Sequence, residues 1–553
     1  MEGSTRTVAA VILELLAKAG VKKAFGIPGV HNLAFWNALS KDLPEIVSVR
    51  HEQSCVYAAD GLSRATGQLA VAITTTGPGA ANTIGAFGEA AISGSQVLVI
   101  SSEAPMKNRS SEGARGILHE MNDQSALFTP LAKRLLIGNQ ELVLSKSCKS
   151  ANEAISTVVD FIKCLSIAPT GAGYIGIPAD LLSQEYKDPI PKPSEQVIAF
   201  ANRLDDTDFD IKSVEELLSE VKKIGIWAGG GATEVTEEIA TLSNHLSAPI
   251  FTSFAGRGVG SSSNNYLSIP IHEIEAENLL AQCEALLVFG SQLDGMNTKN
   301  WSIKFPQKIV LIDADPTIAL RNIAADVIIQ SSNLAGVISK LLKVDGRAKW
   351  VDSAQISLLV RERIASSQSG KAGMALVAAV EKSWPSENQI VCDMAISGYW
   401  IGVYLKANRP RQIGYPVGWG TLGFGLPASL GASAAGLATL LVCGDGGIAF
   451  GLGELATVAQ EKLPVTILLH DDGGYGMLRF DQKVMHHPER GVNLFNPNWK
   501  MLAASFGIEF VETDLNNLAK VLKQRSGINT PSIVLITESI YPPKSTSPRW
   551  NER

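Results

Sequence analysis

The chain has 553 residues, of which 45% are hydrophobic and 18% charged, so it can bury several apolar cores and is not mainly disordered. The formal net charge is −6 and no segment concentrates positive charge, which argues against a nucleic-acid-binding protein. The six cysteines lie far apart without a C-x-x-C pair, so we expect reduced thiols in a cytoplasmic protein rather than a zinc site or disulfides.

Two segments are relevant to whether the protein is secreted or spans a membrane. The first residues, Met1-Glu2-Gly3-Ser4, lack the basic region and apolar run of a secretory signal. The segment 413–444 contains no charged residue or histidine and is long enough to span a bilayer. Its repeated glycines, together with Pro416 and Pro427, instead favour a loop followed by a buried helix between strands. We therefore expect no membrane-spanning segment.

Residues 5 to about 185 alternate between helical and strand-like patterns. Apolar runs typical of strands lie at 24–29, 70–73, 96–100 and 173–178, and the second and third have the β-branching of strands buried on both faces. Strands that alternate with helices predict a parallel, doubly wound sheet.

Two less apolar stretches divide the rest of the chain. Prolines 189, 191 and 193 favour a linker over 183–204, and a polar stretch lies near 343–370. Strand-like runs lie between and after these stretches, at 224–227, 285–290, 309–312, 390–392, 439–442, 465–469 and 532–536. We therefore predict an α/β protein with three doubly wound parallel-sheet domains, over residues 1–185, 195–345 (Rossmann-like) and 365–540, and a C-terminal tail over 541–553.

The chemistry is concentrated where two strands of the third block end. One strand runs into Gly444-Asp445-Gly446, and the next runs into Asp471-Asp472-Gly473-Gly474-Tyr475-Gly476. Ligands of doubly wound sheets collect at this edge. Asp445, Asp472 and the carbonyl of Gly474 offer hard oxygen ligands for Mg²⁺ or Ca²⁺, while amides after Gly446 can bind phosphate oxygens.

This arrangement resembles the cofactor motif of thiamine-diphosphate-dependent enzymes, in which GDG is followed at similar spacing by Asn-Asn. Here Asp471-Asp472 replaces the asparagine pair, and an aspartate at the second position can still bind a metal. The resemblance implies thiamine diphosphate and Mg²⁺ as cofactors, with the metal on Asp445, Asp472 and Gly474. It implies that the cofactor contacts Asp445, Gly446, Gly447, Asp472, Gly474, Tyr475, Gly476 and Met477.

The first block carries further parts of the same resemblance. In the acetolactate synthase and pyruvate decarboxylase superfamily, a glutamate after the second strand hydrogen-bonds N1′ of the aminopyrimidine and favours its imino tautomer. Glu52 stands in that place, before Ala58–Gly67, which is similar to the A-x-G-x-x-R-x-T-G run. The segment Thr74–Asn82 is similar to the TSGPGxxN turn. The resemblance implies that Glu52 is catalytic and that Gly29, Pro78 and Asn82 contact the cofactor.

A third similar segment is Gly418–Ala428, which contains the bulky residue that props the two cofactor rings into a V shape. Leu422 matches that residue, and the Gly420 carbonyl matches the acceptor for the 4′-amino group; a core leucine is the alternative for Leu422. The resemblance covers about residues 5–536 and implies pyrimidine-binding, central and diphosphate-binding domains. It also implies a homodimer or homotetramer with the active site at the subunit interface.

The same resemblance bears on the reaction, in which a 2-oxo acid loses CO₂ and the product meets either a proton or a second electrophile. Gly476-Met477-Leu478 resembles the GMV of acetolactate synthases, where plain decarboxylases have a glutamate in place of Leu478. Val30 stands where those decarboxylases carry Asp or Ser. Without these donors, we expect carboligation or acyl transfer to a carbonyl acceptor. A simple decarboxylase that releases an aldehyde, or an inactive cofactor-binding relative, are the alternatives.

Other residues bear on the substrate and on further cofactors. His119 and Gln124 lie in a segment similar to the active-site loop of FAD-independent acetolactate synthases and could orient substrate, although surface hydrogen bonding is the alternative for each, and His31 is a weaker candidate. Trp419 and Tyr399-Trp400 could narrow the pocket, as for a larger or aromatic 2-oxo acid. The run Ala228–Glu234 lacks a G-x-G-x-x-G with a later acid, so FAD is possible but not favoured.

Overall fold

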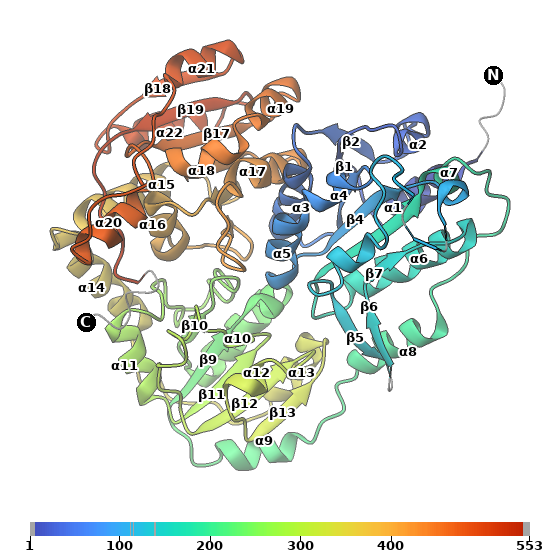
Figure 1. Ribbon diagram of the computed structural model, residues 1–553. Helices are drawn as coiled ribbons and strands as arrows, with labels where there is room; N and C mark the ends of the chain where they lie inside the picture. The colour runs from blue at the N-terminus through green and yellow to red at the C-terminus, as the bar shows by residue number, and fades with distance from the viewer. Residues whose placement is uncertain (1–5, 111, 114, 138–139, 546–553) are drawn as a thin grey trace.

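A computed structural model of the protein describes residues 6–110, 112–113, 115–137 and 140–545. Three parallel sheets flanked by helices confirm the predicted α/β class, and they define an N-terminal, a central and a C-terminal domain (Figure 1, blue, green and orange). Residues 1–5 lie outside the described residues, and so does the part of the predicted C-terminal tail over 546–553.

The N-terminal domain contains a parallel sheet in the order β2-β1-β3-β4-β8-β7. Its strands are β1 (Lys23–Gly26), β2 (Glu45–Ser48), β3 (Ala70–Thr74), β4 (Val97–Glu103), β7 (Ser145–Ser147) and β8 (Ala172–Pro178), and a separate antiparallel pair is formed by β5 (Arg134–Ile137) and β6 (Gln140–Val143). The helices are α1 (Val8–Lys18), α2 (Leu33–Asn37), α3 (Glu52–Thr66), α4 (Pro78–Ala81), α5 (Ile84–Ile92), α6 (Ala151–Ser166) and α7 (Ala179–Leu182). Strands β3, β4 and β8 are buried along their whole length, as their continuous apolar runs predict.

The central domain contains a five-stranded parallel sheet in the order β10-β9-β11-β12-β13. Its strands are β9 (Ile224–Ala228), β10 (Ile250–Thr252), β11 (Ala285–Phe289), β12 (Lys308–Asp313) and β13 (Val327–Gln330). Its helices are α9 (Ile211–Leu218), α10 (Thr236–Leu246), α11 (Ile274–Gln282), α12 (Ala319–Asn322) and α13 (Leu334–Leu341).

The C-terminal domain contains a parallel sheet in the order β15-β14-β16-β17-β19-β18. Its strands are β14 (Gln389–Cys392), β15 (Ile413–Gly414), β16 (Thr439–Gly444), β17 (Val465–His470), β18 (Glu509–Glu512) and β19 (Ser532–Ile536). Its helices are α14 (Ser353–Ser366), α15 (Lys371–Ser383), α16 (Ile396–Tyr404), α17 (Gly425–Ala434), α18 (Asp445–Ile448), α19 (Glu454–Gln460), α20 (Gly476–Val484), α21 (Trp499–Ser505) and α22 (Leu518–Arg525).

The charge-free segment 413–444 forms strand β15, an irregular loop, the buried helix α17 and strand β16, which confirms the predicted loop and helix between strands. No helix in the described part of the chain combines the length and the apolar composition that crossing a bilayer requires. All six cysteines are buried and free, as expected of reduced thiols.

The predicted linker over 183–204 is wrong in its second half. Residues Glu195–Leu204 form helix α8, and Val197 and Leu204 are buried in the apolar core of the N-terminal domain. Because the two residues are seven positions apart, both side chains lie on one face of the helix. The linker prediction gave the nearby prolines more weight than this helical spacing. In the same way, the polar stretch near 343–370 contains α14, which buries Val360 and Ile364.

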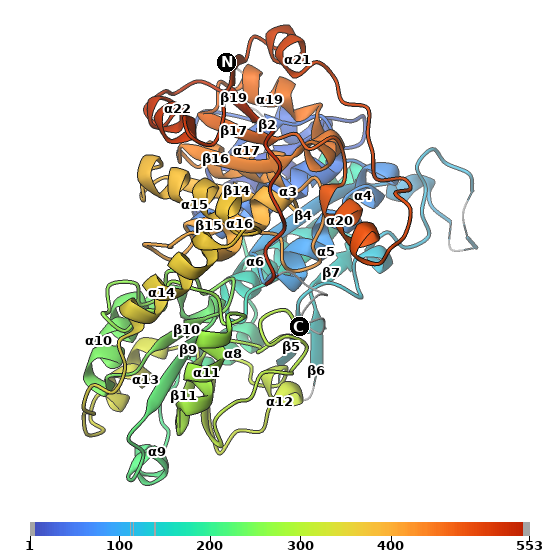
Figure 2. The same ribbon diagram turned by 90° about the vertical axis from the view of Figure 1, so that its left-hand side faces the viewer.

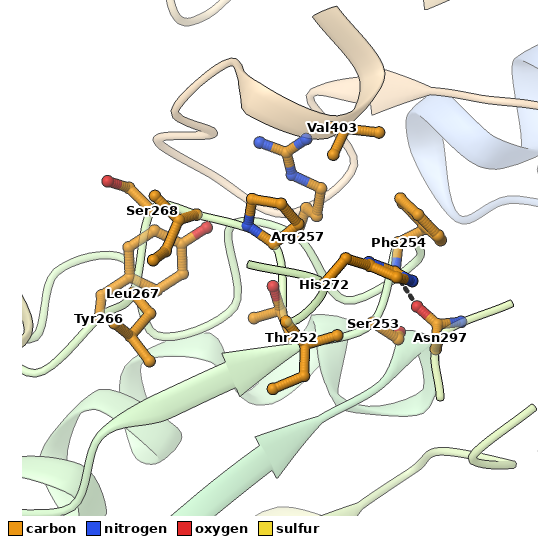
Figure 3. A pocket seen from close by; sticks show the side chains of 13 residues that line it. Thr252, Ser253, Phe254, Arg257, Tyr266, Leu267, Ser268, His272, Asn297 and Val403 are labelled. Atoms are coloured by element: carbon orange, nitrogen blue, oxygen red, sulfur yellow. Dashed lines mark hydrogen bonds between the residues drawn. The ribbon is translucent and has the colours of Figure 1, made fainter. Parts of the chain in front are cut away.

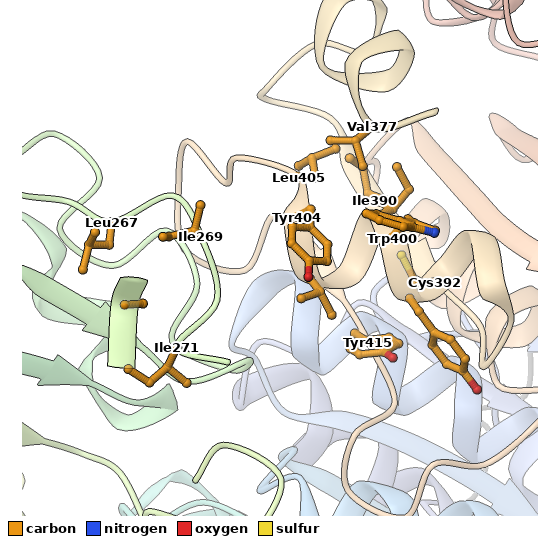
Figure 4. Packing of buried hydrophobic residues seen from close by; sticks show 14 of the residues in the cluster. Leu267, Ile269, Ile271, Val377, Ile390, Cys392, Trp400, Tyr404, Leu405 and Tyr415 are labelled. Carbon is orange, nitrogen blue, oxygen red and sulfur yellow. The ribbon is translucent and has the colours of Figure 1, made fainter. Parts of the chain in front are cut away.

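A shared apolar core joins the central and C-terminal domains (Figure 4). Trp400 of α16 lies within it at 2% exposure, packs flat on Gly373 and donates a hydrogen bond to the Tyr541 carbonyl at 2.7 Å. The expectation that Trp400 narrows a substrate pocket is therefore wrong. Beside this core, a small cavity lies between the central domain and Val403 of α16 (Figure 3), where Arg257 donates to the carbonyls of Gly402 and Leu405.

The N- and C-terminal domains meet where α3 crosses α17, and Figures 1 and 2 show the two helices side by side. A β-carbon on Gly61 would lie 2.1 Å from the Ala428 carbonyl oxygen, and one on Gly431 would lie 1.8 Å from the Ala58 carbonyl oxygen. Backbone therefore touches backbone, because only glycine leaves room for this approach. The contact between α3 and α17 therefore fixes how the N- and C-terminal domains pack against each other.

We predict that Gly431→Ala destabilises the protein, because the added methyl group must push α3 and α17 apart. Overpacking of this kind costs about 1–3 kcal/mol, which lowers the temperature of thermal unfolding measured by calorimetry. The matched control is Gly85→Ala in helix α5, where an added β-carbon meets nothing within 4 Å. That variant should unfold at the wild-type temperature or above it. Equal unfolding temperatures for the two variants would contradict the proposed contact.

Candidate active site

The candidate site begins where β16 and β17 end side by side. Gly444 of β16 pairs with His470 of β17 in parallel register, so the residues that follow, Asp445 and Asp471, leave the sheet at the same level. Asp445 opens helix α18 and is 1% exposed, while the chain after His470 turns through glycines into α20. The two turns predicted from the sequence are therefore neighbours.

A hydrogen-bond bridge ties the two turns together. Asn496 Nδ2 donates to Asp445 Oδ2 at 2.6 Å and to Asp471 Oδ1 at 2.7 Å. Trp499 Nε1 donates to Asp471 Oδ2 at 2.6 Å. The Asp471 carboxylate is thus engaged in holding the turns. Sequence analysis missed Asn496 and Trp499, because they reach the site from a loop and helix far along the chain and carry no local motif.

The carboxylates of Asp445, which is buried, and of Asp472, whose side chain is 22% exposed, each keep an oxygen for a further ligand. In the described residues, Oδ1 of each is buried and makes no hydrogen bond of ordinary geometry. Arg479 donates to the Asp472 carbonyl at 2.8 Å and places its guanidinium 3.6 Å from Asp472 Oδ1. Burial raises the pKa of both carboxyl groups, so a bound cation would relieve the cost of their charge.

This donor set fits the divalent cation that the sequence implies. Two carboxylates with spare oxygens beside a backbone carbonyl are the hard ligands that Mg²⁺ prefers. No group of three or more His, Cys, Asp or Glu side chains with metal-binding geometry occurs in the described ranges. The expected set needs only two such side chains, Asp445 and Asp472, with the carbonyl of Gly474 as the third ligand.

The glycines of the two turns are required by close backbone approach. A β-carbon on Gly446 would lie 2.7 Å from the Tyr475 ring and 3.2 Å from the Gly474 carbonyl oxygen. A β-carbon on Gly476 would lie 1.8 Å from Asp472 Oδ2. Gly474 has φ of 144°, a conformation that side chains rarely adopt. The Gly474 carbonyl therefore lies against the first turn, as the predicted ligand set requires, and Met477 follows on the first turn of α20.

A buried carboxylate, Asp393, holds the loop that contains Gly420 and Leu422. It accepts hydrogen bonds from the backbone N–H of Met394, Gly423 and Gly425 at 2.7, 3.3 and 3.1 Å. Its burial raises its pKa to about 6. A β-carbon on Gly447 would lie 3.1 Å from this carboxylate. Sequence analysis missed Asp393, whose single signal is its place directly after strand β14.

In the same loop, the residues predicted to contact the cofactor rings, Gly420 and Leu422, are both partly exposed. Gly420 has φ of 69°, and its neighbour Leu422 is half-buried, so Leu422 is not a fully buried core leucine. Ser397 and Gly398 begin helix α16 close by, and a β-carbon on Gly398 would lie 2.1 Å from the Asp393 carbonyl oxygen.

A second set of predicted residues meets in the N-terminal domain. Glu52 opens helix α3, and Asn82 Nδ2 donates to Glu52 Oε2 at 3.1 Å. A β-carbon on Gly79 would lie 3.7 Å from Glu52 Oε1, so the turn that begins at Pro78 lies directly beside the carboxylate. A β-carbon on Gly29 would lie 2.8 Å from the Thr75 hydroxyl of the same turn. The fold therefore brings together Gly29, Glu52, Pro78 and Asn82.

Gln124 lies behind this turn. It is 3% exposed, and its Oε1 accepts the Gly77 N–H at 2.7 Å. Its Nε2 donates to the Tyr174 hydroxyl at 2.6 Å and to the Ser102 carbonyl at 3.1 Å. The amide is fully used within the protein, so its geometry is that of a support for the turn.

Two histidines, His31 and His119, lie beside the turn at Pro78. The ring of His119, which is exposed, lies 6.1 Å from the ring of His31 in an edge-to-face arrangement. His31 Nδ1 shares a hydrogen bond of 3.0 Å with the Thr76 hydroxyl. Burial, and then the proximity of His119, lower the pKa of His31.

The residues around Glu52 belong to the N-terminal domain and those around Asp445 and Asp472 to the C-terminal domain, and we call them the N-terminal and C-terminal half-sites. Among the described residues, no hydrogen bond joins Glu52 to the turns at Asp445 and Asp472. Both half-sites carry exposed apolar side chains: Val30 is 86% exposed on the N-terminal set, and Leu478 is 53% exposed on the C-terminal set.

Family models cover all three domains of the chain. They describe the N-terminal TPP-binding, central and C-terminal TPP-binding domains of thiamine pyrophosphate enzymes, and they match residues 6–127, 211–339 and 393–536. Thiamine pyrophosphate is another name for thiamine diphosphate. The matched ranges contain both half-sites.

Relatives with assigned reactions are similar over nearly the whole length. A probable 2-ketoarginine decarboxylase of Pseudomonas aeruginosa is 29% identical over 96% of this chain and 94% of that protein. A probable acetolactate synthase large subunit of Methanocaldococcus jannaschii is 26% identical over 91% and 86%. The thiamine-diphosphate-dependent 4-hydroxybenzoylformate decarboxylase of Rhodococcus jostii shares the fold, with a TM-score of 0.76 at 20% identity over 97% of this chain and 99% of that one. The chain therefore belongs to the thiamine-diphosphate-dependent enzymes of the acetolactate synthase and pyruvate decarboxylase superfamily.

Proposed function

We propose that this protein uses thiamine diphosphate and Mg²⁺ to decarboxylate a 2-oxo acid and to transfer the remaining carbon unit to a carbonyl acceptor. Asp445, Asp472 and the Gly474 carbonyl would hold the cation, and the amides after Gly446 would bind the diphosphate. The Gly420 carbonyl and Leu422 would contact the two rings. Bound thiamine diphosphate supplies the nucleophilic carbon and the electron sink for loss of CO₂.

Glu52 has the position of the proton-exchanging carboxylate. Asn82 donates to its Oε2, which leaves Oε1, on the side of Gly79, to exchange a proton with the aminopyrimidine ring. Because Glu52 is half-buried at the start of α3, its carboxylate is fixed by the fold and shielded from part of the solvent. The presence of Glu52, Asp445 and Asp472 together argues against an inactive relative.

We favour transfer to a carbonyl acceptor over release of an aldehyde because of one observation. Val30 and Leu478 are exposed at the two half-sites and cannot donate a proton. General acid catalysis by one positioned group contributes about 10²–10⁴-fold. Without it, protonation of the decarboxylated product slows, and a bound carbonyl acceptor can compete. The products would then be 2-hydroxy ketones or 2-hydroxy-3-oxo acids.

A second candidate function is simple decarboxylation with release of an aldehyde. It is favoured by the pair His31 and His119, whose imidazoles lie 6.1 Å apart beside the turn at Pro78 and can supply a proton. The similarity to a probable 2-ketoarginine decarboxylase points to a guanidino-substituted 2-oxo acid as one substrate to test. Trp419, which is half exposed, would line the pocket for a larger or aromatic substrate.

We further propose a cytoplasmic homodimer or homotetramer in which the N-terminal half-site of one chain faces the C-terminal half-site of another. The exposed apolar side chains Val30, Leu118, Leu478, Met485 and Phe495 would then be covered by a second copy. FAD is not part of this proposal. In the central domain, Gly229 and Gly231 pack against Gly290 of the neighbouring turn, and this close approach accounts for both glycines without a nucleotide.

We predict that Glu52→Gln still binds thiamine diphosphate but loses about 10²-fold or more of its turnover, because the amide cannot exchange the proton. Calorimetry would measure binding, and a coupled assay for CO₂ release would measure turnover. Glu45→Gln, on the exposed edge of β2, is the control and should keep wild-type turnover. Turnover of Glu52→Gln within threefold of wild type would contradict the assignment.

We predict that Asp445→Ala weakens Mg²⁺-dependent binding of thiamine diphosphate by more than about 10²-fold, because a buried ligand and its charge are lost. Asp472→Asn should bind nearly as well as wild type, since the amide oxygen can still contact the metal. Calorimetric titration of each variant with and without Mg²⁺ is the measurement. Tight binding by Asp445→Ala would show that the metal lies elsewhere.

We predict that Leu478→Glu raises the ratio of free aldehyde to ligated product, because it restores a proton donor at the C-terminal half-site. Chromatographic product analysis with a panel of 2-oxo acids and a saturating aldehyde acceptor measures the ratio. Val484→Glu, at the far end of the same helix α20, is the matched control and should leave the ratio unchanged. Wild-type protein that makes only free aldehyde would replace the transfer proposal with the decarboxylase alternative.

A further inference from the structure

A buried network of charged side chains lies between helices α3 and α5 of the N-terminal domain. Arg64 forms a fork with Asp60, from Nε to Oδ1 at 2.7 Å and from Nη2 to Oδ2 at 2.8 Å. The same Nη2 donates to Glu89 Oε1 at 2.8 Å. The side chains of Asp60 and Glu89 are fully buried, and that of Arg64 is 14% exposed. No predicted contact with cofactor or metal uses any of the three.

This network reaches across the domain boundary to the loop of the C-terminal domain that leads to Gly420. Glu89 Oε2 accepts the Trp419 backbone N–H at 2.7 Å, and its Oε1 accepts the Gly418 N–H at 3.1 Å. Arg64 Nη1 donates to the Tyr415 carbonyl at 2.7 Å. One buried acid of the N-terminal domain therefore binds two successive amides of the loop.

Packing reinforces these hydrogen bonds at both ends of the loop. A β-carbon on Gly88 would lie 2.2 Å from the Trp419 indole, so this ring lies directly on the backbone of α5. At the far end, the Arg64 guanidinium carbon lies 4.9 Å from the centre of the Phe424 ring. The residues between these two contacts include Gly420 and Leu422, which the proposed function assigns to the cofactor rings.

Stability alone does not account for three buried charges at this place. Buried ion pairs add little net stability over apolar groups of similar size, because desolvation offsets their attraction. A carboxylate, in contrast, accepts two backbone N–H groups at once and fixes their direction. The network is therefore suited to setting the path of the loop.

We propose that Glu89, held by Arg64 and Asp60, is a positioning residue that fixes loop 415–424 before the cofactor binds. The Gly420 carbonyl and the Leu422 side chain would then need no ordering on binding, which favours affinity. This inference rests on the proposed cofactor site, but the order of the loop without cofactor can be measured independently. It makes the ring-binding loop of one domain depend on an acid of another domain in the same chain.

The test compares Glu89→Gln with the wild type in the full-length protein. In Glu89→Gln, the amide nitrogen faces backbone N–H donors, so one of the two loop hydrogen bonds is lost. Hydrogen exchange followed by mass spectrometry, without cofactor, should show faster exchange of the amides in 413–426. Calorimetry should show binding of thiamine diphosphate with Mg²⁺ weakened by about 10–100-fold.

The matched control is Glu454→Gln. Glu454 is 1% exposed and also crosses the two domains, since it accepts the Arg50 N–H at 2.9 Å, but none of its hydrogen bonds involves loop 415–424. This variant should leave loop exchange and cofactor affinity unchanged, even if its unfolding temperature falls. If Glu89→Gln does not fold, Arg64→Lys takes its place in the same measurements, because it keeps the charge but loses the fork to Asp60 and the hydrogen bond to the Tyr415 carbonyl.

Two outcomes overturn the inference, and a third separates it from the proposed function. Wild-type exchange in 413–426 as fast as in exposed loops would show that the loop is not fixed in advance. Variants that unfold at lower temperature but keep wild-type loop exchange and cofactor affinity would show a purely structural role. If wild-type protein fails to bind thiamine diphosphate while the loop still loosens in Glu89→Gln, the proposed function fails and the positioning of the loop stands.

Discussion

The parallel pairing of Gly444 with His470 is the constraint on which the candidate site depends. It aligns the ends of β16 and β17, so that Asp445 and Asp472 meet although a helix and a strand separate them along the chain. Parallel strands joined by a helical crossover always bring their carboxyl ends to one edge. The glycines at 446, 474 and 476 then let the two turns approach closely, as the proposed metal site requires.

Buried carboxylates recur wherever the site needs a fixed backbone. Asp393 binds the amides of Gly423 and Gly425, and Glu89 binds those of Gly418 and Trp419. Each acid loses hydration on burial and regains hydrogen bonds from backbone donors. The loop between these two carboxylates is thereby held from two domains. Such preorganisation is what a cofactor with two rings at a set angle demands.

The division of the site between two domains is the basis of the proposed oligomer. In the proposed assembly, the N-terminal domain of one chain would supply the carboxylate of Glu52 with its supporting turn, and the C-terminal domain of another would supply the metal and diphosphate ligands. Apolar residues are exposed on both half-sites, such as Val30 and Leu478, and a second copy would remove them from water. In the proposed assembly, the surfaces that join two chains would therefore also form the active site.

The sequence by itself determined the α/β class, the main strands and the local motifs at Glu52, Asp445 and Asp472. These follow from short-range signals, namely apolar runs, glycine turns and the spacing of acids after strands. Tertiary structure alone decided which distant groups complete the site. Asn496 bridges two turns, Glu89 holds a loop of another domain, and Trp400 turns into the core instead of the pocket. Helix α8 likewise forms where the prolines suggested a linker, because Val197 and Leu204 pack into the core of the N-terminal domain. The physical reason is the same in each case: a side chain's partner is set by packing between elements far apart in the chain, and no local pattern carries that information.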